Sequence, residues 1–332
     1  MASRRLWASV TALAVAVTGT ALALSTAGTS GAEVQPAAAA AALPDGFKHV
    51  GYSTASGGTA AAIPYDKLTH VMYSFARPNA DGSLQPLQNT AKLEQIVQLA
   101  RPHGVKVMIA VGGWMDGDDS AFETLAATPE GRARHVQALV GLVDQYGLDG
   151  VDMDWEYPDP GVSAERFTLL MSELSTALHG RGKLLTAAVS SKNAGSGVQP
   201  EVFALVDFLN IMTYDGGTPH ANVDWTVDAV NWWKGRGLPA GKAVVGVPFY
   251  SRPSFLTFAD LVARDQANAD RDCVVVNGKD ECYNGLPNLR TKTSWALANA
   301  GGMMNWQLAM DATGTYSAVT AIYETATAAS GS

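Results

Sequence analysis

The segment over residues 149–158 carries the strongest chemical signal in the sequence. It places three acids, Asp152, Asp154 and Glu156, at alternate positions of an otherwise apolar run. Because side chains alternate across a β-strand, the acids would share one face, with successive Cα atoms about 6.6 Å apart. Buried neighbouring carboxylates disfavour one another's charge and raise at least one pKa. The pattern predicts a site that keeps one acid protonated at neutral pH beside ionised partners, as acid–base catalysis requires.

Two plainer interpretations of this segment fit the residues less well. An EF-hand calcium loop requires a glycine at a fixed position and a ligand spacing that the segment lacks. A solvated strand end does not explain the apolar residues that flank the acids, which are Leu148, Val151, Met153 and Trp155.

The two cysteines, Cys273 and Cys282, do not indicate metal or redox chemistry. Two thiolates alone cannot complete a tetrahedral zinc site, and neither cysteine has the basic neighbour that favours a reactive thiolate. In an exported protein the expected outcome is a single disulfide that closes a loop. We therefore expect no metal and no cofactor.

The acids need a scaffold, and the chain provides short apolar runs that alternate with helical segments. The runs are rich in Val, Ile, Met and aromatic residues, as expected of strands buried on both faces. They span residues 49–52, 70–75, 106–111, 150–155, 184–189, 208–213, 243–249 and 302–307. Helices are expected over residues 90–103, 129–146, 163–179, 223–236 and 288–299.

Eight strand–helix alternations in about 250 residues predict an α/β fold, a single (β/α)8 TIM barrel, over residues 44–332. A doubly wound open sheet is the alternative. It is weakened because no G-x-G-x-x-G phosphate fingerprint follows the first strand. A barrel has its chemistry at the carboxyl ends of its strands.

The acidic segment, Asp149-x-x-Asp152-x-Asp154-x-Glu156 followed by Tyr157 and Pro158, resembles the catalytic signature of family 18 glycoside hydrolases, in particular their chitinases. Other segments resemble strands of that family in the order of the chain. These are residues 68–70 and 73–76 for the second strand, 107–114 for the third, 212–215 for the sixth, 247–252 for the seventh, and 283–285 with 304–308 for the eighth.

The resemblance implies retaining hydrolysis of β-1,4-linked N-acetylglucosamine polymers with help from the substrate, an exception to the scheme of two catalytic carboxylates. Glu156 would protonate the glycosidic oxygen while the 2-acetamido carbonyl attacks the anomeric carbon, and water would open the resulting oxazolinium ion. Asp154 would orient the acetamido N–H. Asp152 would share a proton with Asp154 and raise the pKa of Glu156 by like-charge repulsion. Tyr214 would hydrogen-bond the acetamido oxygen, and Asp215 would lie beside the scissile sugar.

The resemblance also implies residues that bind chitin or N-acetylglucosamine oligosaccharides. Trp306 would form the floor under the sugar, because an aromatic face packs against the C–H face of a pyranose. Trp114 would stack on another sugar. The remaining residues implied are Tyr52, Phe75, Tyr157, Met212 and Arg252. Of the other tryptophans, Trp225 is a candidate for the cleft, whereas Trp232 and Trp233 fit the packing of a helix.

The chain departs from the family pattern in two places. Ala110 stands where many relatives have a serine, which removes a hydroxyl expected near Asp152. The segment between Arg252 and residue 302 is too short for the α+β insertion that walls the cleft of many relatives. We therefore expect an open groove and an endo-acting enzyme. In the same segment Asn277 and Gly278 indicate a hairpin turn, so two short strands joined by the disulfide are expected.

Composition restricts the partners of the chain. It has 332 residues, a formal net charge of −8 and only 16% charged residues. Nucleic acids and anionic membranes are bound by basic surfaces that release counterions. The acidic balance argues against both partners and is compatible with a neutral ligand. The expected assembly is a monomer.

Residues 1–43 differ from the rest of the sequence. Arg4 and Arg5 precede an apolar, uncharged stretch over 8–24, and residues 25–27 resemble a signal-peptidase site. We expect a cleaved signal peptide and a secreted, extracellular protein, by either the Sec or the twin-arginine route. A membrane anchor is the alternative, because the stretch approaches the ~17–25 residues that a spanning helix needs.

Two further functions remain open. An inactive chitin-binding lectin on the same barrel would usually lack the acid at position 156, which this chain retains. An endo-β-N-acetylglucosaminidase that acts on glycoproteins, or an enzyme for peptidoglycan, is the other alternative. The sequence Trp155-Glu156-Tyr157-Pro158 favours chitin over these substrates.

Overall fold

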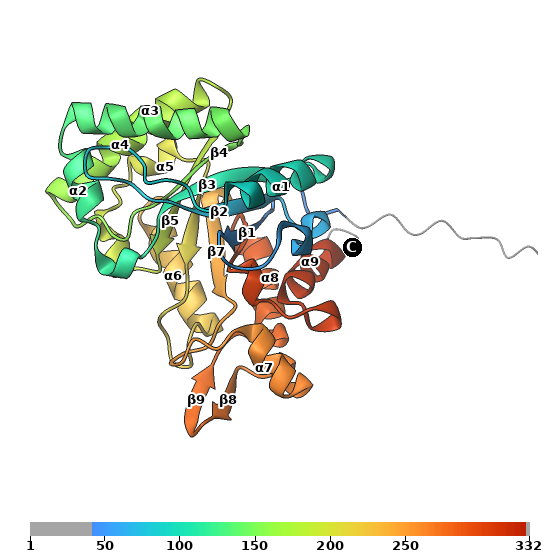
Figure 1. The fold of residues 1–332 in the computed structure, drawn as a ribbon. Coiled ribbons are helices and arrows are strands. Elements are labelled where there is room, and N and C mark those ends of the chain that lie inside the picture. The colour runs from blue at the N-terminus through green and yellow to red at the C-terminus, as the bar shows by residue number, and fades with distance from the viewer. Residues whose placement is uncertain (1–41, 330–332) are drawn as a thin grey trace, which may run out of the picture. The chain divides into compact units, whose positions relative to one another are not determined.

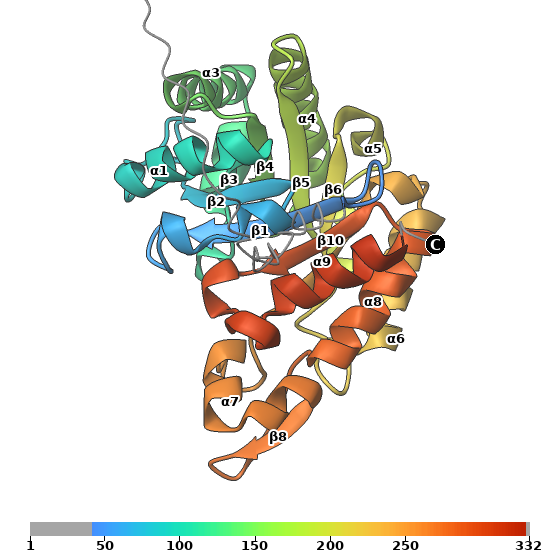
Figure 2. The same ribbon diagram turned by 90° about the vertical axis from the view of Figure 1, so that its right-hand side faces the viewer.

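The computed structural model describes residues 42–329 as a barrel surrounded by helices (Figures 1 and 2). Its eight parallel strands close in the order β1-β10-β7-β6-β5-β4-β3-β2. The barrel strands are β1 (Lys48–Thr54), β2 (His70–Ala76), β3 (Lys106–Gly112), β4 (Gly150–Asp154), β5 (Leu184–Ser190), β6 (Phe208–Met212), β7 (Ala243–Pro248) and β10 (Gly302–Trp306). Each coincides with one of the eight predicted apolar runs, so the predicted (β/α)8 barrel is confirmed. The predicted signal peptide lies, except for its last two residues, outside the described part of the chain.

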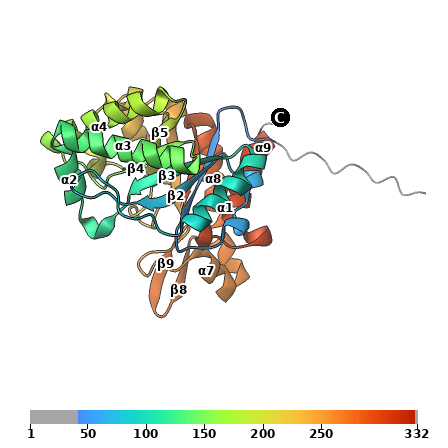
Figure 3. The same cartoon turned by 45° about the horizontal axis from the view of Figure 1, so that its top comes forward.

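Helices connect the strands and cover the outside of the barrel (Figure 3). The α-helices are α1 (Thr90–Ala100), α2 (Ser120–Ala126), α3 (Pro129–Tyr146), α4 (Val162–His179), α5 (Val202–Leu205), α6 (Val223–Gly235), α7 (Phe258–Arg264), α8 (Leu286–Asn299) and α9 (Ala318–Ala328). The 3-10 turns are η1 (Ala60–Ala62), η2 (Tyr65–Lys67), η3 (Arg101–His103), η4 (Met115–Gly117), η5 (Asn193–Gly197), η6 (Ala240–Lys242), η7 (Gln266–Asp270), η8 (Leu308–Met310) and η9 (Gly314–Tyr316). None of the helices within residues 42–329 is long and apolar enough to cross a membrane.

Local sequence signals explain where α3 begins and ends, and why α1 is shorter than predicted. The hydroxyl of Thr128 accepts a hydrogen bond from the N–H of Gly131, and Pro129 occupies the first turn, where its missing N–H is not needed. Gly147 ends the helix with φ 63°. The predicted helix over 90–103 changes to the 3-10 turn η3 after Ala100, because Pro102 disrupts the α-helical hydrogen-bond ladder.

The apolar residues form two layers. One lies between the strands and the surrounding helices and includes Val151, Met153 and Trp155. The other fills the barrel and includes Tyr52, Met72, Met108 and Met304. Because successive side chains of a strand point to opposite faces, Asp152 and Asp154 of β4 face the interior while their apolar neighbours pack against the helices.

The remaining two strands, β8 (Cys273–Val276) and β9 (Lys279–Cys282), form an antiparallel hairpin beside α7 (Figure 1). The predicted disulfide joins Cys273 to Cys282 and is confirmed. The predicted turn is also found, with Asn277 at φ 52° and Gly278 at φ 76°. The connection between β7 and β10 therefore contains α7, η7, this hairpin and α8, of which the hairpin and α8 were expected and α7 and η7 were not.

Candidate active site

A groove of about 1010 Å³ lies at the carboxyl ends of the barrel strands. Eleven of the predicted site residues line it: Tyr52, Phe75, Trp114, Asp154, Glu156, Tyr157, Met212, Tyr214, Asp215, Arg252 and Trp306. They come from seven of the eight barrel strands or from the loops that follow them. Residues distant in the sequence are thus brought to one end of the barrel, where enzymes of this architecture have their sites.

Asp152 lies beneath the groove and is fully buried. Its Oδ2 accepts a hydrogen bond from the hydroxyl of Tyr52 at 2.5 Å, and its Oδ1 accepts from Thr186 Oγ1 at 2.6 Å and Asn210 Nδ2 at 3.1 Å. Burial raises the pKa of Asp152, and these donors oppose the rise by stabilising its anion. The network therefore favours an ionised group at the base of the site.

Asp154 and Glu156 form the next level of the site. Asp154 ends β4, and Glu156 follows the strand at a less buried position. Their carboxyl groups are hydrogen-bonded to each other, and the Tyr157 hydroxyl also bonds to Glu156. Burial, followed by the charges of Glu156 and Asp152, raises the pKa of Asp154 well above its usual range. Burial is also the main cause that raises the pKa of Glu156. Burial and the neighbouring charges thus disfavour ionisation of this pair, and the two groups titrate together.

Two expected roles of Asp152 remain predictions, and the arrangement of its hydrogen bonds bears on both. Its proton was expected to be shared with Asp154, but the structure pairs Asp154 with Glu156, because three other donors already occupy the Asp152 oxygens. Its negative charge was expected to raise the pKa of Glu156; in this structure the charge raises the pKa of Asp154, the hydrogen-bond partner of Glu156. The neighbouring charge that raises the pKa of Glu156 is Asp215.

Tyr214 and Asp215 follow β6 on another side of the groove. Tyr214 is buried, and burial raises the pKa of its hydroxyl well above the usual range, so it remains a hydrogen-bond donor. Asp215 accepts hydrogen bonds from the Tyr250 hydroxyl at 2.7 Å and from Arg252 Nε at 2.8 Å. Burial alone would raise the pKa of Asp215, but contacts with His220, Tyr250 and Arg252 outweigh it and lower the pKa. An ionised Asp215 therefore faces the protonated pair.

Aromatic side chains form the surface of the groove. The Trp306 ring packs against Phe75, with centroids 5.6 Å apart and planes inclined by 28°, and contacts Tyr52 edge-on. Trp114 is 59% exposed. Trp225 also lines the groove, and the Lys192 ammonium lies 4.0 Å from its ring centroid. The helix α6 also carries Trp232 and Trp233, which pack against the core rather than the groove.

Ala110 lies on β3, directly opposite Asp152 on β4. It is fully buried, so the missing hydroxyl would have lain within the carboxylate network. The Asp152 oxygens are nevertheless satisfied by Tyr52, Thr186 and Asn210. The departure from the family pattern at this position thus leaves no unpaired oxygen on Asp152.

Sequence reasoning did not identify Thr186, Asn210, Tyr250 or Phe255 as parts of the site. Thr186 and Asn210 are polar residues within apolar runs, on strands β5 and β6 beside β4. That interruption of the apolar pattern is the signal that could have indicated them. Tyr250 and Phe255 lie in the loop after β7, where their position depends on the fold of the loop.

The residues that the structure describes include no group of three or more His, Cys, Asp or Glu side chains arranged to hold a metal ion. Asp152 is instead bonded to two hydroxyls and an amide, and Asp154 is bonded to Glu156. The arrangement can hold and transfer a proton above a buried negative charge.

Comparison with known proteins identifies related sequences. The family model described as "Glycosyl hydrolases family 18" matches residues 48–311. An endochitinase of Manduca sexta is 32% identical over 228 residues, which cover 57% of this chain and 41% of that protein. A chitinase-like effector of Moniliophthora roreri is 28% identical over 285 residues, which cover 72% of this chain and 70% of that protein.

Comparison with solved structures gives the same fold. The GH18 chitinase ChiB from the chitin utilization locus of Flavobacterium johnsoniae has a TM-score of 0.75 and 27% identity, over 84% of this chain and 94% of that one. Curated relatives are often longer: the matched part is 10% of a Drosophila melanogaster protein named probable chitinase 10, and 56% of chitinase 1 of Aphanocladium album. The chain thus spans less than two thirds of the length of these relatives.

Proposed function

The chain belongs to glycosyl hydrolase family 18, and from that premise we propose that it is a secreted, endo-acting chitinase. It would hydrolyse β-1,4-linked N-acetylglucosamine polymers with retention of configuration, through participation of the substrate's own acetamido group. The names of several relatives, which are chitinases or endochitinases, support the substrate class. The signal-like features of residues 1–43 support export.

One observation carries this proposal: the Asp154–Glu156 pair holds a proton at the base of an aromatic groove, above the buried Asp152. The raised pKa of Glu156 suits a general acid that protonates a leaving-group oxygen. The Oδ1 atom of Asp154 is buried and has no hydrogen-bond partner among the described residues. A buried acceptor without a partner is unfavourable, so a ligand N–H at this position would be stabilised.

The acetamido group of the substrate would supply hydrogen-bond partners for Asp154 and Tyr214. Its N–H would donate to Asp154, which aligns its carbonyl oxygen for attack on the anomeric carbon as the glycosidic bond breaks. The Tyr214 hydroxyl would donate to that oxygen and fix its position. Proton transfer from Glu156 to the departing sugar oxygen completes the first step. In the second step the Glu156 carboxylate accepts a proton from the water that opens the oxazolinium ion, which restores the acid.

The proposal is tested by replacing the general acid. Glu156→Gln keeps the shape of the side chain but has no proton to donate, so turnover of chitin oligomers should fall by at least ~100-fold while binding persists. Wild type and variant would be incubated with chitin, chitosan, an N-glycoprotein and peptidoglycan, and the products identified by mass. Glu165→Gln, at an exposed position of α4, is the matched control.

Different results would contradict the assigned acid, the substrate class and the participation of the acetamido group. Undiminished hydrolysis by Glu156→Gln would remove this residue as the acid. Products from glycoprotein or peptidoglycan without products from chitin would overturn the substrate class. A thiazoline analogue of the oxazolinium ion should compete with the substrate, and failure to inhibit would contradict participation of the acetamido group.

A further inference from the structure

Phe255 is an exposed aromatic residue in the wall of the groove. It lies in the loop after β7, and the residue is 54% exposed. Its backbone has φ 55°, in the left-handed region that bulky residues rarely adopt. An apolar side chain that is half in solvent and held on an unfavourable backbone is poorly explained by packing of the fold alone.

The Phe255 ring is held in a defined position. The Arg252 guanidinium carbon lies 3.7 Å from its centroid, and Tyr250 is stacked beside it with centroids 5.4 Å apart and planes inclined by 22°. Arg252 is itself fixed by its ion pair with Asp215, with Nη2 and Oδ1 2.7 Å apart. Phe255 nevertheless lines the groove and remains 54% exposed, so part of the ring is accessible there.

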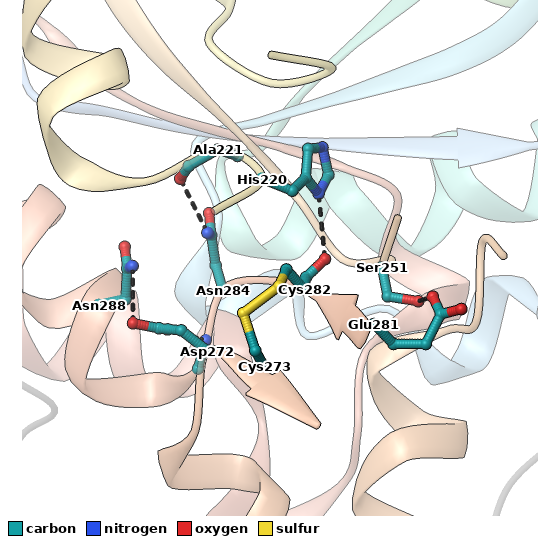
Figure 4. The surroundings of a disulfide bond; sticks show 10 residues. His220, Ala221, Ser251, Asp272, Cys273, Glu281, Cys282, Asn284 and Asn288 are labelled. Atoms are coloured by element: carbon teal, nitrogen blue, oxygen red, sulfur yellow. Dashed lines mark hydrogen bonds between the residues drawn. A yellow bond between two sulfur atoms is a disulfide. The ribbon is translucent and has the colours of Figure 1, made fainter. Parts of the chain in front are cut away.

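The disulfide hairpin braces the loop that carries this ring (Figure 4). The buried Glu281 of β9 accepts hydrogen bonds from Ser251 Oγ at 2.6 Å and from the Ser254 N–H at 3.0 Å. The backbones of Cys282 and Arg252 exchange two hydrogen bonds of 2.9 Å. The loop is thus attached to the hairpin on both sides of Arg252, which restricts the positions that Phe255 can adopt.

The same hairpin contacts the loop that follows β6. The carbonyl of Cys282 lies 3.3 Å from Nδ1 of His220 (Figure 4). On the other side of the ring, His220 Nε2 accepts a hydrogen bond from the Asp215 N–H at 3.1 Å. The hairpin therefore fixes Phe255 relative to Asp215 of the reaction centre. A rigid aromatic surface at a set distance from the reacting groups is what a binding site for a neighbouring unit of a polymer needs.

We propose that Phe255 is a sugar-binding platform of this chain, on which a pyranose ring outside the reacting unit stacks when a long oligosaccharide occupies the groove. This inference rests on the proposed function and specifies how the substrate is held. A pyranose presents a C–H face that packs on an aromatic ring and removes apolar area from water. The nearby Arg252 and Asp215 offer a donor and an acceptor to sugar hydroxyls. Phe255 would thereby set the preference for longer substrates.

The test compares Phe255→Ala with wild type on chitin oligomers from the trimer to the hexamer. The variant should raise the KM for the hexamer by roughly threefold to tenfold, the size of effect expected for one aromatic contact. The kcat and KM for the shortest oligomer that is cleaved should change by less than about twofold, because that substrate does not reach the ring. Phe255→Trp should restore the hexamer KM. Leu169→Ala, at a 49% exposed position of α4, is the matched control.

A stability measurement separates binding from packing. Phe255→Asn should keep the melting temperature, because asparagine tolerates the left-handed backbone and this gain offsets the lost contacts with Arg252 and Tyr250, and it should still raise the hexamer KM. An equal rise in KM at every length, or a lowered melting temperature in Phe255→Asn, would overturn the inference and leave the proposed function intact. If the wild type cleaves no chitin oligomer, the proposed function fails and this inference fails with it.

Discussion

Asp152 is a buried carboxylate that never reaches the groove, yet its ionisation influences the groups that do. Its two oxygens accept three hydrogen bonds, and its charge raises the pKa of Asp154, which in turn is bonded to Glu156. Any donor that is lost makes the Asp152 anion less stable. If Asp152 were protonated, it would carry no charge to raise the pKa of Asp154, and the Asp154–Glu156 pair would lose its proton more readily.

Thr186→Val tests this link between the buried network and the site. Valine has the shape of threonine but lacks the hydroxyl that lies 2.6 Å from Asp152 Oδ1. The loss of one hydrogen bond to a charged group, worth about 1.5–3 kcal/mol, should raise the Asp152 pKa and lower kcat roughly 10- to 100-fold. Protonation of Asp152 would then begin at a higher pH, so the acid limb of the kcat profile should move upward.

Thr293→Val is the matched control, since the Thr293 hydroxyl is also buried but bonds the Leu289 carbonyl within α8. It should leave the pH profile of kcat unchanged. The same profile for both variants would show that Asp152 does not need the Thr186 hydroxyl to remain ionised.

At the residue scale, the three acids were predictable from the sequence, but the residues that hydrogen-bond to them were not. Charged side chains at alternate positions of an apolar strand cost free energy to bury. Asp152, Asp154 and Glu156 therefore stand out in the sequence as candidates for a function. Thr186 is an ordinary strand residue until the register of β4 and β5 pairs it with Asp152. That register depends on closure of the barrel, and it could not be predicted from the sequence.

At the scale of elements, the strands were predictable because each is buried on both faces and therefore apolar nearly throughout. The hairpin β8–β9 followed from Asn277-Gly278 between two cysteines. Phe255 was not predictable, because its exposure results from the contacts of the β7 loop with Glu281 and Cys282. Loops acquire their positions from tertiary contacts, which no local pattern encodes.

The short connection between β7 and β10 predicts how the polymer enters the groove. This connection contains only a hairpin, the helices α7 and α8 and the short turn η7 among its described residues. The groove also has two exposed aromatic residues, Trp114 and Phe255. The open groove that this short connection leads us to expect would let an internal segment of a chain bind from the side. Digestion of a soluble chitin derivative should therefore lower its viscosity early, with products of mixed length.

The product series over the first minutes measures this prediction, with viscosity and reducing ends followed in parallel. Glu156→Gln provides the baseline without turnover. Dimers that dominate from the start, while viscosity remains high, would instead indicate stepwise release from a chain end and contradict entry from the side.

At the scale of the whole molecule, two buried histidines and one partly buried histidine predict that the fold loses stability in acid. Burial lowers the pKa of His49, His70 and His135 to about 4. In the unfolded chain each has a pKa near 6.5, so the unfolded state binds more protons between pH 6.5 and 4. Each histidine therefore contributes stability that is present above pH 6.5 and lost as the pH falls, roughly 2–3 kcal/mol by pH 4.5.

His135→Asn isolates one of these contributions. His135 Nδ1 lies 3.1 Å from the carbonyl of Gly82 and donates to it, while its Nε2 has no partner among the described residues. The asparagine amide can replace the donating nitrogen but cannot take up a proton. The variant should be less stable than wild type at pH 7, because it leaves space beside Phe122, but should lose about 2–3 kcal/mol less between pH 6.5 and 4.5.

The free energy of unfolding in urea, measured at both pH values, gives this difference directly. The buried carboxylates whose pKa values are raised, among them Asp154 and Asp311, act in the opposite direction, but they are present in both proteins and cancel in the comparison. His103→Asn, at an exposed position, should show the wild-type loss. If His135→Asn loses as much stability in acid as wild type does, His135 is protonated without penalty in the folded barrel, and the acid sensitivity must come from other groups.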